Sequence, residues 1–409
     1  MRNRELKDSA IPWIGDIPIS WEVIPHKRVM HKIKEIQEHY NGEDIISLTM
    51  RGVIVRDLDA GGKMPTSFDG YQKVYPNNLL QCLFDIDVTP RCVGLIKNEG
   101  LTSPAYSQFE MHSNAYAPYY DYLLRYMDDR KTLLHLSKNL RSSLTETDFG
   151  AIDTCVPSII EQQKIANFLD RKCTEIDEMI ALQEKIVEEL KAYKQSVITE
   201  AVTKGLNPDV PMKDSGIEWI GEIPEHWRIT TIGRLFRVSA GGDAKWDIYS
   251  DKQDSEHPFP VYTNTLDKNQ TYAYTSIPVY KGDTITVTGR GDIGRAFYRK
   301  TPFDAIIRLL VLEKRYSLDC RYFAYFINNV IHFFTNSAAI GQLSAVQVVP
   351  YNLCHPSIEE QTDIADYLDT KCTEIDNLIS IKLSKIDSLK EYKKSIIYEY
   401  VTGKKEVTE

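Results

Sequence analysis

The sequence predicts an α+β fold in which two mixed α/β domains are separated by two long helices that pair as an antiparallel coiled coil. The first observation is a repeat: the stretch from Pro157 to Thr203 occurs again from Pro356 to Thr402, without a gap and with about half of its positions identical. The second is that neither copy contains Pro or Gly after its opening Pro-Ser. The third is that the segment before each copy mixes strand and helix patterns. Because such self-similarity indicates repeated architecture, we expect an internal pseudo-two-fold repeat.

Length and composition limit the class of protein. The chain has 409 residues, of which 42% are hydrophobic and 26% charged, which is typical of a globular protein with several domains. The N-terminus lacks the apolar stretch of a signal peptide, and no apolar run approaches the length of a membrane span. We therefore expect a cytoplasmic protein without a membrane partner. The seven Cys form no C-x-x-C pair, which predicts buried thiols and neither a disulfide nor a zinc site.

The formal net charge of −9 argues against a nucleic-acid binder when the chain is taken as a whole. The charge is unevenly distributed, however. Residues 228–321 carry 15 Lys and Arg against 11 Asp and Glu, whereas the two long repeats and the C-terminal tail are acidic. An acidic scaffold that carries a locally basic module is compatible with DNA binding, although composition does not demand it.

A second repeat opens each half of the chain. Residues 7–21 and 213–227 share an Ile-Gly pair and an Ile-Pro pair, and each has two spaced Trp: Trp13 and Trp21, then Trp219 and Trp227. The density of Pro and Gly predicts turns and short edge strands. We expect the Trp side chains to fix this segment to a domain; a role in binding a ligand is the alternative.

Each domain is predicted to combine strands with one helix. Apolar and β-branched residues predict strands in the first domain at 45–49, 52–56, 78–86 and 92–96. A helical periodicity follows over 119–140. In the second domain we expect strands at 285–288 and 305–312 and a helix at 322–331.

Each copy of the long repeat has an apolar stripe of the kind that a coiled coil buries. In a heptad frame the d positions include Met179, Ile186, Tyr193, Leu378 and Tyr392, while e positions such as Cys173 broaden the stripe. The two stripes are expected to pack on each other through Leu169, Ile176, Ile180, Leu190, Leu368, Ile375, Ile379 and Leu389. Gln183 or Lys382 occupies the central a position of each copy, where a polar residue can set register. An ordinary helical hairpin in one large core is the alternative.

The run Gly289-Arg-Gly-Asp-Ile-Gly294 matches the G-x-G-x-x-G pattern of dinucleotide-binding proteins. That interpretation needs a helix to begin there, but the next residues are strand-like and Pro302 stops any helix early. We therefore predict a Gly-rich β-turn. The alternative that stays open is a loop that approaches a phosphate through its backbone, Arg290 or Arg295. No P-loop, H-E-x-x-H, G-x-S-x-G or Asn-Pro-Pro-Phe-like element is found, which predicts a chain without catalytic residues that recognises a partner.

Several of these motifs together resemble the specificity (S) subunit of Type I DNA restriction–modification systems. They are the P-S-x-x-E-Q-x-x-I-A-x-x-L-D runs at Pro157 and Pro356, the Cys-Thr-Glu-Ile-Asp segments that follow them, and the W-I-G-x-I-P-x-x-W openings at Trp13 and Trp219. The resemblance covers the chain essentially from end to end. It implies a first target recognition domain at 1–156, a long helix at 157–204, a hinge and second target recognition domain at 205–355, and a second long helix with a tail at 356–409.

The resemblance also implies a function and a set of partners. Each domain would read one half of an interrupted sequence in double-stranded DNA, and the helices would fix the gap between the halves. Two modification subunits, which bind S-adenosylmethionine and methylate adenine, would dock on the helices. Restriction subunits, which use ATP and Mg²⁺ for translocation and cleavage, would join the complex. The chain itself would bind no cofactor and no metal.

Two groups of residues are candidates for these contacts. Base reading in the major groove needs Arg, Lys, Asn or Gln side chains on exposed loops. The candidates for DNA contact are Arg290, Arg295, Lys245, Asn264, Tyr106 and Gln108. The resemblance also suggests subunit docking at the start of each long helix, around Glu161, Gln162, Glu360 and Gln361. The competing hypotheses are a coiled-coil scaffold that binds proteins and no nucleic acid, which the net acidity favours, and a nucleotide-dependent enzyme.

Overall fold

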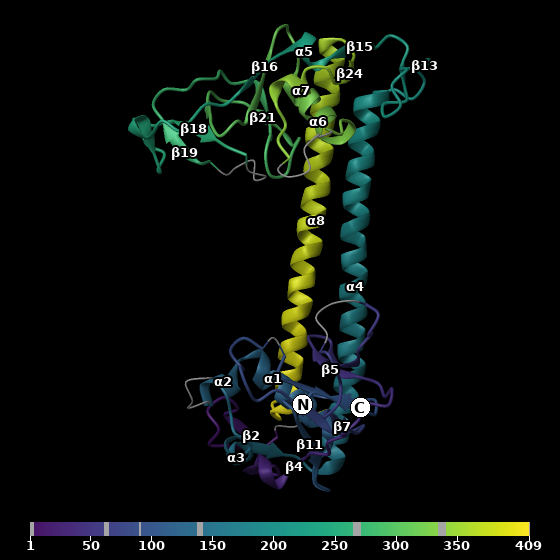
Figure 1. Ribbon diagram of the computed structural model, residues 1–409, viewed down its shortest axis with the longest axis vertical. Helices are drawn as coiled ribbons and strands as arrows, with labels where there is room; N and C mark the ends of the chain where they lie inside the picture. Colours follow the sequence, from purple (N-terminus) through teal and green to yellow (C-terminus); the bar gives the residue numbers. More distant parts are fainter. Residues whose placement is uncertain are drawn as a thin grey trace. The chain divides into compact units, whose positions relative to one another are not determined.

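The computed structural model describes residues 4–60, 65–89, 91–136, 142–264, 271–333 and 341–408. The chain forms two compact units: unit 1 comprises residues 1–183 and 384–409, and unit 2 comprises residues 184–383. The chain passes between the units inside two long helices, α4 (Ile159–Lys204) and α8 (Ile358–Val401), drawn in teal and yellow in Figure 1. Each unit therefore contains one half of each helix. The four-segment division suggested by the sequence follows the helix ends and stays a prediction.

Each unit begins with a small antiparallel hairpin. In unit 1, β1 (Leu6–Asp8) pairs with β2 (Asp16–Pro18). In unit 2, β13 (Met212–Asp214) pairs with β14 (Glu222–Pro224). Both turns use a Gly with a positive φ, Gly15 at 68° and Gly221 at 72°, a conformation that favours glycine. These hairpins confirm the turns and short strands predicted for the repeated openings.

Unit 1 is built on a four-stranded antiparallel sheet whose strands follow the order β4-β11-β8-β9. These strands are β4 (Met30–Ile33), β11 (Ser107–Met111), β8 (Leu79–Gln81) and β9 (Val93–Leu95). Helix α1 (Ala117–Asp129) contacts β9. A separate pair, β3 (Glu22–Pro25) with β12 (Asp153–Val156), leads directly into α4. The core therefore lies where the sheet, α1 and the long helices meet, and it includes Leu123, Leu169 and Ile396.

Smaller elements complete unit 1. They are the η1 turn (His26–Arg28), β5 (Ile46–Thr49) with β6 (Gly52–Val55), β7 (Gln72–Val74) with β10 (Gly100–Thr102), α2 (Thr132–Leu136) and α3 (Glu146–Ala151). The single helix predicted over 119–140 is wrong. The helix ends at Asp129 and Lys131 has a φ of 53°, which interrupts it before α2; residues 137–140 lie outside the described part. The strand predicted at 78–86 forms only over Leu79–Gln81.

Unit 2 repeats the same central sheet, in the order β16-β23-β20-β21 and again fully antiparallel. The strands are β16 (Phe236–Ala240), β23 (Leu310–Lys314), β20 (Thr284–Val287) and β21 (Ala296–Arg299). Helix α6 (Cys320–Val330) contacts β20 and β21. The pair of β15 (Arg228–Thr231) with β24 (Asn352–His355) leads into α8, and α5 (Ile232–Leu235) and α7 (Ala345–Val348) lie beside them in sequence. The repeat thus extends from the helices to the sheet.

A second four-stranded sheet distinguishes unit 2. Its order is β17-β19-β18-β22, formed by β17 (Tyr249–Ser250), β19 (Ala273–Thr275), β18 (Phe259–Tyr262) and β22 (Asp304–Ala305). The η2 turn (Trp246–Ile248) precedes it. The single strand predicted at 305–312 is wrong, because Ile307 and Arg308 have φ angles of 54° and 60°. That turn separates β22 in one sheet from β23 in the other.

The two long helices lie antiparallel within each unit (Figure 1). In unit 1, Asp177 of α4 pairs with Lys393 of α8 at 2.6 Å, and in unit 2, Asp376 of α8 pairs with Lys194 of α4 at 2.7 Å. This arrangement confirms the antiparallel helix pair. In the described residues, no helix combines the length and apolar character needed to cross a membrane.

The stripe that faces the partner helix differs from the predicted heptad frame. Buried or half-buried residues of α4 recur at Leu169, Cys173, Ile176, Ile180, Gln183, Val187, Leu190 and Lys194. In α8 they recur at Leu368, Cys372, Ile375, Ile379, Lys382, Ile386, Leu389 and Lys393. Of the residues assigned to d, Ile186 is half-buried, but Met179, Tyr193, Leu378 and Tyr392 are exposed, at 43%, 56%, 46% and 54%. A seam needs alternate spacings of four and three, and the residues assigned to a and e provide it, so the d assignment was wrong.

Candidate nucleic-acid interface

The Gly-rich loop of unit 2, residues 288–295, joins β20 to β21 as a hairpin. The amide of Gly294 donates to the Thr288 carbonyl at 2.8 Å, and the amide of Arg295 donates to Thr288 Oγ1 at 2.9 Å. All eight residues are described, and no helix begins among them. The predicted β-turn is therefore confirmed. A dinucleotide pyrophosphate would need the amides of a helix N-terminus, which this loop does not supply.

Two of the six candidates for DNA contact lie on this loop with exposed side chains. Arg290 donates one N–H to Gln342 Oε1 at 3.2 Å, and Arg295 Nε contacts Asp292 at 3.3 Å. Arg295 keeps 55% of its side chain exposed. A guanidinium has five N–H donors, so each side chain retains donors for an outside acceptor. The prediction that Arg290 and Arg295 contact DNA stays a prediction, with a geometry that permits it.

Two further candidates in unit 2 support the fold. Asn264 Oδ1 accepts from the Gly289 amide at 2.7 Å while its Nδ2 donates to the Ile307 carbonyl at 2.6 Å. Lys245 pairs with the buried Asp304 at 2.9 Å, and Tyr249 donates to the same carboxylate at 2.9 Å. Their polar groups face protein partners, so the prediction that Asn264 reads bases is corrected to a role in joining two loops. Lys245 supplies the positive charge that the buried Asp304 carboxylate needs.

Of the two candidates in unit 1, the structure corrects Gln108 and leaves Tyr106 a prediction. Gln108 is fully buried: its Oε1 accepts from the Tyr75 amide at 2.7 Å and its Nε2 donates to the Lys73 carbonyl at 3.0 Å. Tyr106 is half-buried and packs against Phe84 with ring centroids 6.2 Å apart. Gln108 cannot reach a base, because its amide satisfies backbone groups inside the domain.

The four residues proposed for subunit docking fix the first turn of each long helix. Gln162 is fully buried; it accepts from the Tyr116 amide at 2.7 Å and donates to the Asn114 carbonyl at 2.8 Å. Gln361 is 1% exposed and accepts from the Asp319 amide at 3.1 Å. Buried amides must be hydrogen-bonded, and these are used within the unit. Gln162 and Gln361 are therefore not docking residues, whereas docking at the partly exposed Glu161 and Glu360 stays a prediction.

The Glu residues in the same pairs bind the repeated Trp. Trp21 donates its indole N–H to Glu161 at 3.0 Å, and Trp227 donates to Glu360 at 3.0 Å. Arg4 adds an ion pair to Glu161, and His226 lies 2.9 Å from Glu360. The contact explains why both motifs recur: each opening segment is fixed to the N-terminus of the long helix in its own unit. The role predicted for Trp21 and Trp227 is confirmed, although the sequence did not reveal Glu as their partner.

Buried tyrosines form a second repeated contact that was missed from the sequence. Tyr119 donates its hydroxyl to the Val401 carbonyl at 2.9 Å, and Tyr322 donates to the Val202 carbonyl at 3.0 Å. Burial raises the pKa of both phenols well above its usual value, so they remain neutral donors. The carbonyls belong to the last turn of a long helix, where backbone acceptors lack partners in the helix. The 199-residue offset between Val202 and Val401 was the available signal.

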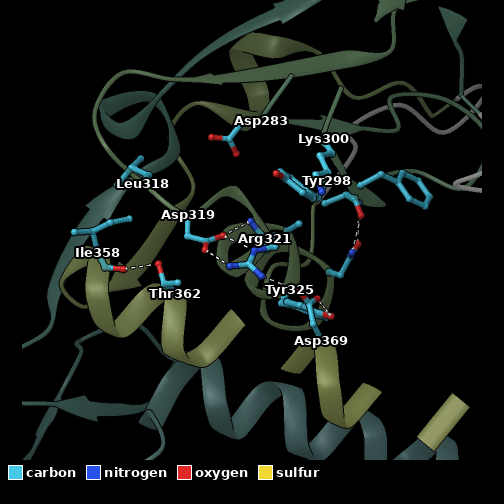
Figure 2. Close-up of a pocket in the computed structure, with 14 residues that line it drawn as sticks. Asp283, Tyr298, Lys300, Leu318, Asp319, Arg321, Tyr325, Ile358, Thr362 and Asp369 are labelled. Carbon is cyan, nitrogen blue, oxygen red and sulfur yellow. Dashed lines mark hydrogen bonds and ion pairs between the residues drawn. The ribbon is translucent and has the colours of Figure 1, made fainter. Parts of the chain in front are cut away.

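The largest pocket described in unit 2 has a volume of about 870 Å³ and lies between α6 and α8 (Figure 2). Its polar lining is dominated by Arg321, whose side chain points toward Asp319. Asp283, Tyr298 and Lys300 line the opposite side. The pocket combines acidic, basic and aromatic side chains, so it is a candidate for a catalytic or binding site.

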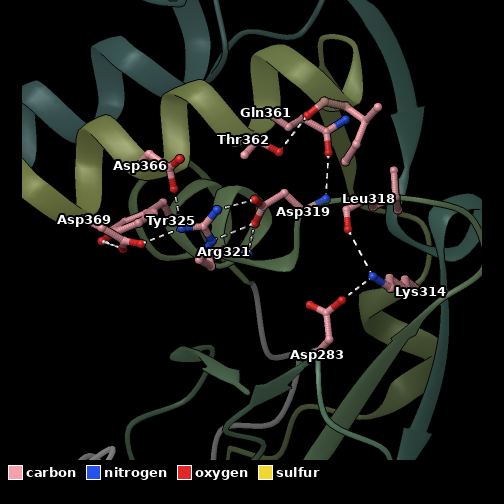
Figure 3. Close-up of polar contacts among 11 residues, drawn as sticks. Asp283, Lys314, Leu318, Asp319, Arg321, Tyr325, Gln361, Thr362, Asp366 and Asp369 are labelled. Atoms are coloured by element: carbon pink, nitrogen blue, oxygen red, sulfur yellow. Dashed lines mark hydrogen bonds and ion pairs between the residues drawn. The ribbon is translucent and has the colours of Figure 1, made fainter. Parts of the chain in front are cut away.

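These polar groups neutralise one another (Figure 3). Arg321 donates to Asp319 at 2.7 Å, to Asp366 at 2.6 Å and to Asp369 at 2.9 Å. The hydrogen bond to Asp319 is the main cause of a raised pKa at Arg321. Tyr325 donates to Asp369 at 2.8 Å. Arg321 therefore fastens α6 to α8, and this side of the pocket is a junction of paired charges.

The cysteines and the other titratable groups give no sign of a metal centre. All seven Cys are buried and free, which confirms the prediction of buried thiols. Burial raises the pKa of the Cys155 and Cys354 thiols to about 12, so neither is a thiolate at neutral pH. Within the residues that the structure describes, no group of three or more His, Cys, Asp or Glu is placed to hold a metal ion.

Comparison with known proteins gives concordant matches. A family model described as the Type I restriction modification DNA specificity domain matches residues 224–391. A specificity subunit of *Methanocaldococcus jannaschii*, named for the type I restriction enzyme MjaX, is 25% identical over 308 residues, covering 72% of this chain and 69% of that protein.

Two solved structures share the fold. A chain from a structure of the type I R-M system, studied for complex assembly and conformational transition, has a TM-score of 0.74 at 14% identity, covering 94% of this chain and 98% of the other. The crystal structure of the HsdS subunit from *Thermoanaerobacter tengcongensis* has a TM-score of 0.56 at 15% identity, covering 95% of this chain and 98% of the other. At these identities the likeness concerns the fold alone.

Proposed function

We propose that this chain, which is similar to the specificity subunits of Type I restriction–modification systems, recognises a DNA target made of two different half-sites separated by an unspecified gap. Unit 1 reads one half-site and unit 2 reads the other. The chain supplies recognition and no catalytic group. Methyl transfer from S-adenosylmethionine to adenine, and the ATP- and Mg²⁺-dependent steps of restriction, belong to partner subunits.

One observation carries this proposal. Each unit holds the same four-stranded antiparallel sheet, fixed to the long helices by the same Trp–Glu and Tyr–carbonyl contacts. The elements attached to that sheet differ, with the β5–β6 and β7–β10 pairs in unit 1 and a second four-stranded sheet in unit 2. A constant frame that carries two different sets of loops is suited to an asymmetric target, because base reading depends on loop side chains.

We propose that two modification subunits dock on exposed apolar residues of the long helices, in place of the helix starts suggested by the sequence. Unit 1 exposes Met179, Leu182 and Tyr392, at 43%, 56% and 54%. Their repeat equivalents in unit 2 are Leu378, Ile381 and Tyr193, at 46%, 62% and 56%. Matched exposed apolar residues in two units provide equivalent attachment points for two copies of one partner.

The test is to sequence the modified bases in DNA from cells that express this chain with its modification subunit. We expect a new methylated motif of two short half-sites around a gap, which disappears when this chain is omitted. Absence of a motif, with a partner that folds and binds S-adenosylmethionine, would overturn the proposal. The chain would then be a protein-binding scaffold, and DNA affinity without a steep dependence on salt would support that alternative.

A further inference from the structure

The turn that connects β22 to β23 has an unusual backbone for its residues. The Leu309 amide donates to the Ile306 carbonyl at 3.1 Å, which closes a four-residue β-turn. Its two central residues, Ile307 and Arg308, have φ angles of 54° and 60°. Positive φ at both central positions is the mark of a type I′ turn, for which Asn-Gly is the favoured pair. A β-branched residue such as Ile is a genuine outlier there, so the turn is strained.

Hydrogen bonds with two neighbouring segments hold the turn in this shape. The Gly241 amide donates to the Leu309 carbonyl at 2.7 Å, and the Ile307 amide donates to the Gly242 carbonyl at 3.0 Å. Asn264 donates to the Ile307 carbonyl at 2.6 Å. Strained backbone persists only where the surroundings determine it so fully, and such positions are concentrated at functional sites.

The Gly-rich loop abuts the same turn. A Cβ at Gly289 would lie 2.8 Å from the Leu343 carbonyl oxygen and 3.2 Å from the Arg308 carbonyl oxygen, so only glycine allows this approach. Asn264 joins the two segments, because it accepts from Gly289 while it donates to Ile307. The first glycine of the G-x-G-x-x-G run thus has a structural reason unrelated to nucleotides: it lets the loop that carries Arg290 pack against the Ile307–Arg308 turn.

The turn presents an arginine to solvent. Arg308 is exposed, and its guanidinium has no hydrogen-bond or ion-pair partner within the part of the chain that the structure describes. Ile307 beside it is 41% exposed, so neither side chain contributes to the core. The strained turn therefore places neither side chain in a hydrophobic core. The rigid turn instead fixes the position of the Arg308 backbone, from which the guanidinium extends into solvent.

We propose that Arg308 reads a guanine in the half-site recognised by unit 2, through paired hydrogen bonds from its guanidinium to O6 and N7. This inference rests on the proposed function and assigns one specificity-determining residue within it. Arginine is suited to the task because its planar fork matches the two acceptors of guanine in the major groove. A rigid turn supports such recognition, since a preorganised side chain loses less freedom on binding.

The experiment is a selection from a random-sequence DNA duplex library with the complex of this chain and its modification subunit. The wild type should enrich two half-sites. Arg308→Ala should lose the preference for guanine at one position of one half-site by roughly 10- to 100-fold, with the other positions unchanged. Arg234→Ala is the matched control: Arg234 is exposed on α5 of the same unit, and removing its charge should leave the base preferences as they are.

A double variant separates recognition from folding. Ile307→Asn with Arg308→Gly installs the residue pair that this backbone favours, so its melting temperature should equal or exceed that of the wild type. The same guanine preference should nevertheless disappear. Ile307→Asn alone should keep both the stability and the preference, because Arg308 remains on the same turn.

The possible failures are distinguishable. A wild-type complex that enriches no motif would overturn the proposed function together with this inference. A wild-type motif that Arg308→Ala leaves unchanged would overturn this inference alone. A loss of affinity that is equal for all sequences would also overturn it, because a phosphate contact carries no base preference.

Discussion

The contacts of the repeated Trp and Tyr side chains with the long helices correspond in unit 1 and unit 2. Trp21 binds Glu161 and Trp227 binds Glu360, both at 3.0 Å. Tyr122 donates to Asp170 at 2.7 Å, and its counterpart Tyr325 donates to Asp369 at 2.8 Å. Each pair joins residues that are far apart in sequence. These hydrogen bonds are therefore shared by two domains whose sequences differ extensively.

The differences lie in the strands attached to the central sheet. Unit 1 has two separate two-stranded pairs, β5–β6 and β7–β10, where unit 2 has the β17-β19-β18-β22 sheet and the strained turn at Ile307 and Arg308. These segments do not contribute the Trp–Glu or Tyr–carbonyl contacts. They can change without loss of the attachment to the helices, which is the freedom that two different half-sites require.

One buried position differs in chemistry between the repeated elements of unit 1 and unit 2. His26 in unit 1 and Ile232 in unit 2 are both fully buried and follow equivalent strands. The His26 amide donates to the Ile152 carbonyl, as the Ile232 amide does to the Tyr351 carbonyl, both at 2.9 Å. His26 Nε2 has no partner among the described residues. Unit 1 thus contains a buried titratable group at a place where unit 2 has a hydrocarbon.

The largest expected effect comes from removing the anchoring indoles. Trp21→Ala should destabilise unit 1, and Trp227→Ala should destabilise unit 2, each by about 3–5 kcal/mol, because the loss of a large buried side chain leaves a cavity and removes a hydrogen bond to a partly buried Glu. Hydrogen exchange measured by mass spectrometry would localise the loss. Trp219→Ala is the control, since Trp219 is 49% exposed and should cost far less. An equal loss of protection from hydrogen exchange in both units after one substitution would contradict the view that each Trp stabilises only its own unit.

The pH dependence of unit 1 should be the next largest difference. Burial lowers the pKa of His26 to about 4 from its usual value of 6.5. Between these values the unfolded chain binds a proton that the folded chain does not, so stability falls as the pH falls. From pH 7 to pH 5 the loss is about 2 kcal/mol. Urea unfolding at both pH values should show that His26→Ile, which copies unit 2, removes this part of the acid sensitivity; an unchanged pH slope would refute the assignment.

The tyrosine contacts should have matched, smaller effects. Tyr119→Phe and Tyr322→Phe each remove the hydroxyl that satisfies a buried helix carbonyl, at a cost of about 1–2 kcal/mol. Thermal and urea unfolding of the two variants should agree closely. The Tyr322 hydroxyl lies 3.0 Å from both the Val202 and the Cys354 carbonyl oxygens. In unit 1 the hydroxyl of a different residue, Tyr120, donates to the Cys155 carbonyl. A clearly larger effect at Tyr322 would mean that this shared contact matters more than the repeat suggests.

The smallest effect is expected at the ion pairs between the helices. Lys393→Ala in unit 1 and Lys194→Ala in unit 2 each remove one pair whose Asp is mostly exposed, at 58% and 59%. Each should cost at most about 1 kcal/mol, and less in high salt. Urea unfolding at low and high salt tests this. A cost that persists in high salt would indicate that the Lys stem packs on the seam, as its half-buried position allows.

Several site predictions from the sequence failed for one reason. Gln108, Gln162 and Gln361 have the residue type of a base reader or a docking residue, yet each is buried and satisfies backbone groups. Asn264 likewise joins two loops. A polar side chain serves as readily inside a domain as outside it, and residue type alone does not distinguish the two. Burial depends on contacts between segments that are distant in the chain.

The sequence by itself determined the duplicated plan, because a repeated apolar periodicity without Pro or Gly leaves few alternatives to two long helices that pair. It also determined the Gly-rich hairpin and the buried thiols, since local residue chemistry sets both. Only the tertiary structure decided which stripe of each helix faces the other, which Glu receives each Trp, and that Ile307 and Arg308 form a turn in the middle of an apolar run. These features arise from long-range contacts, whose free energy exceeds local preferences.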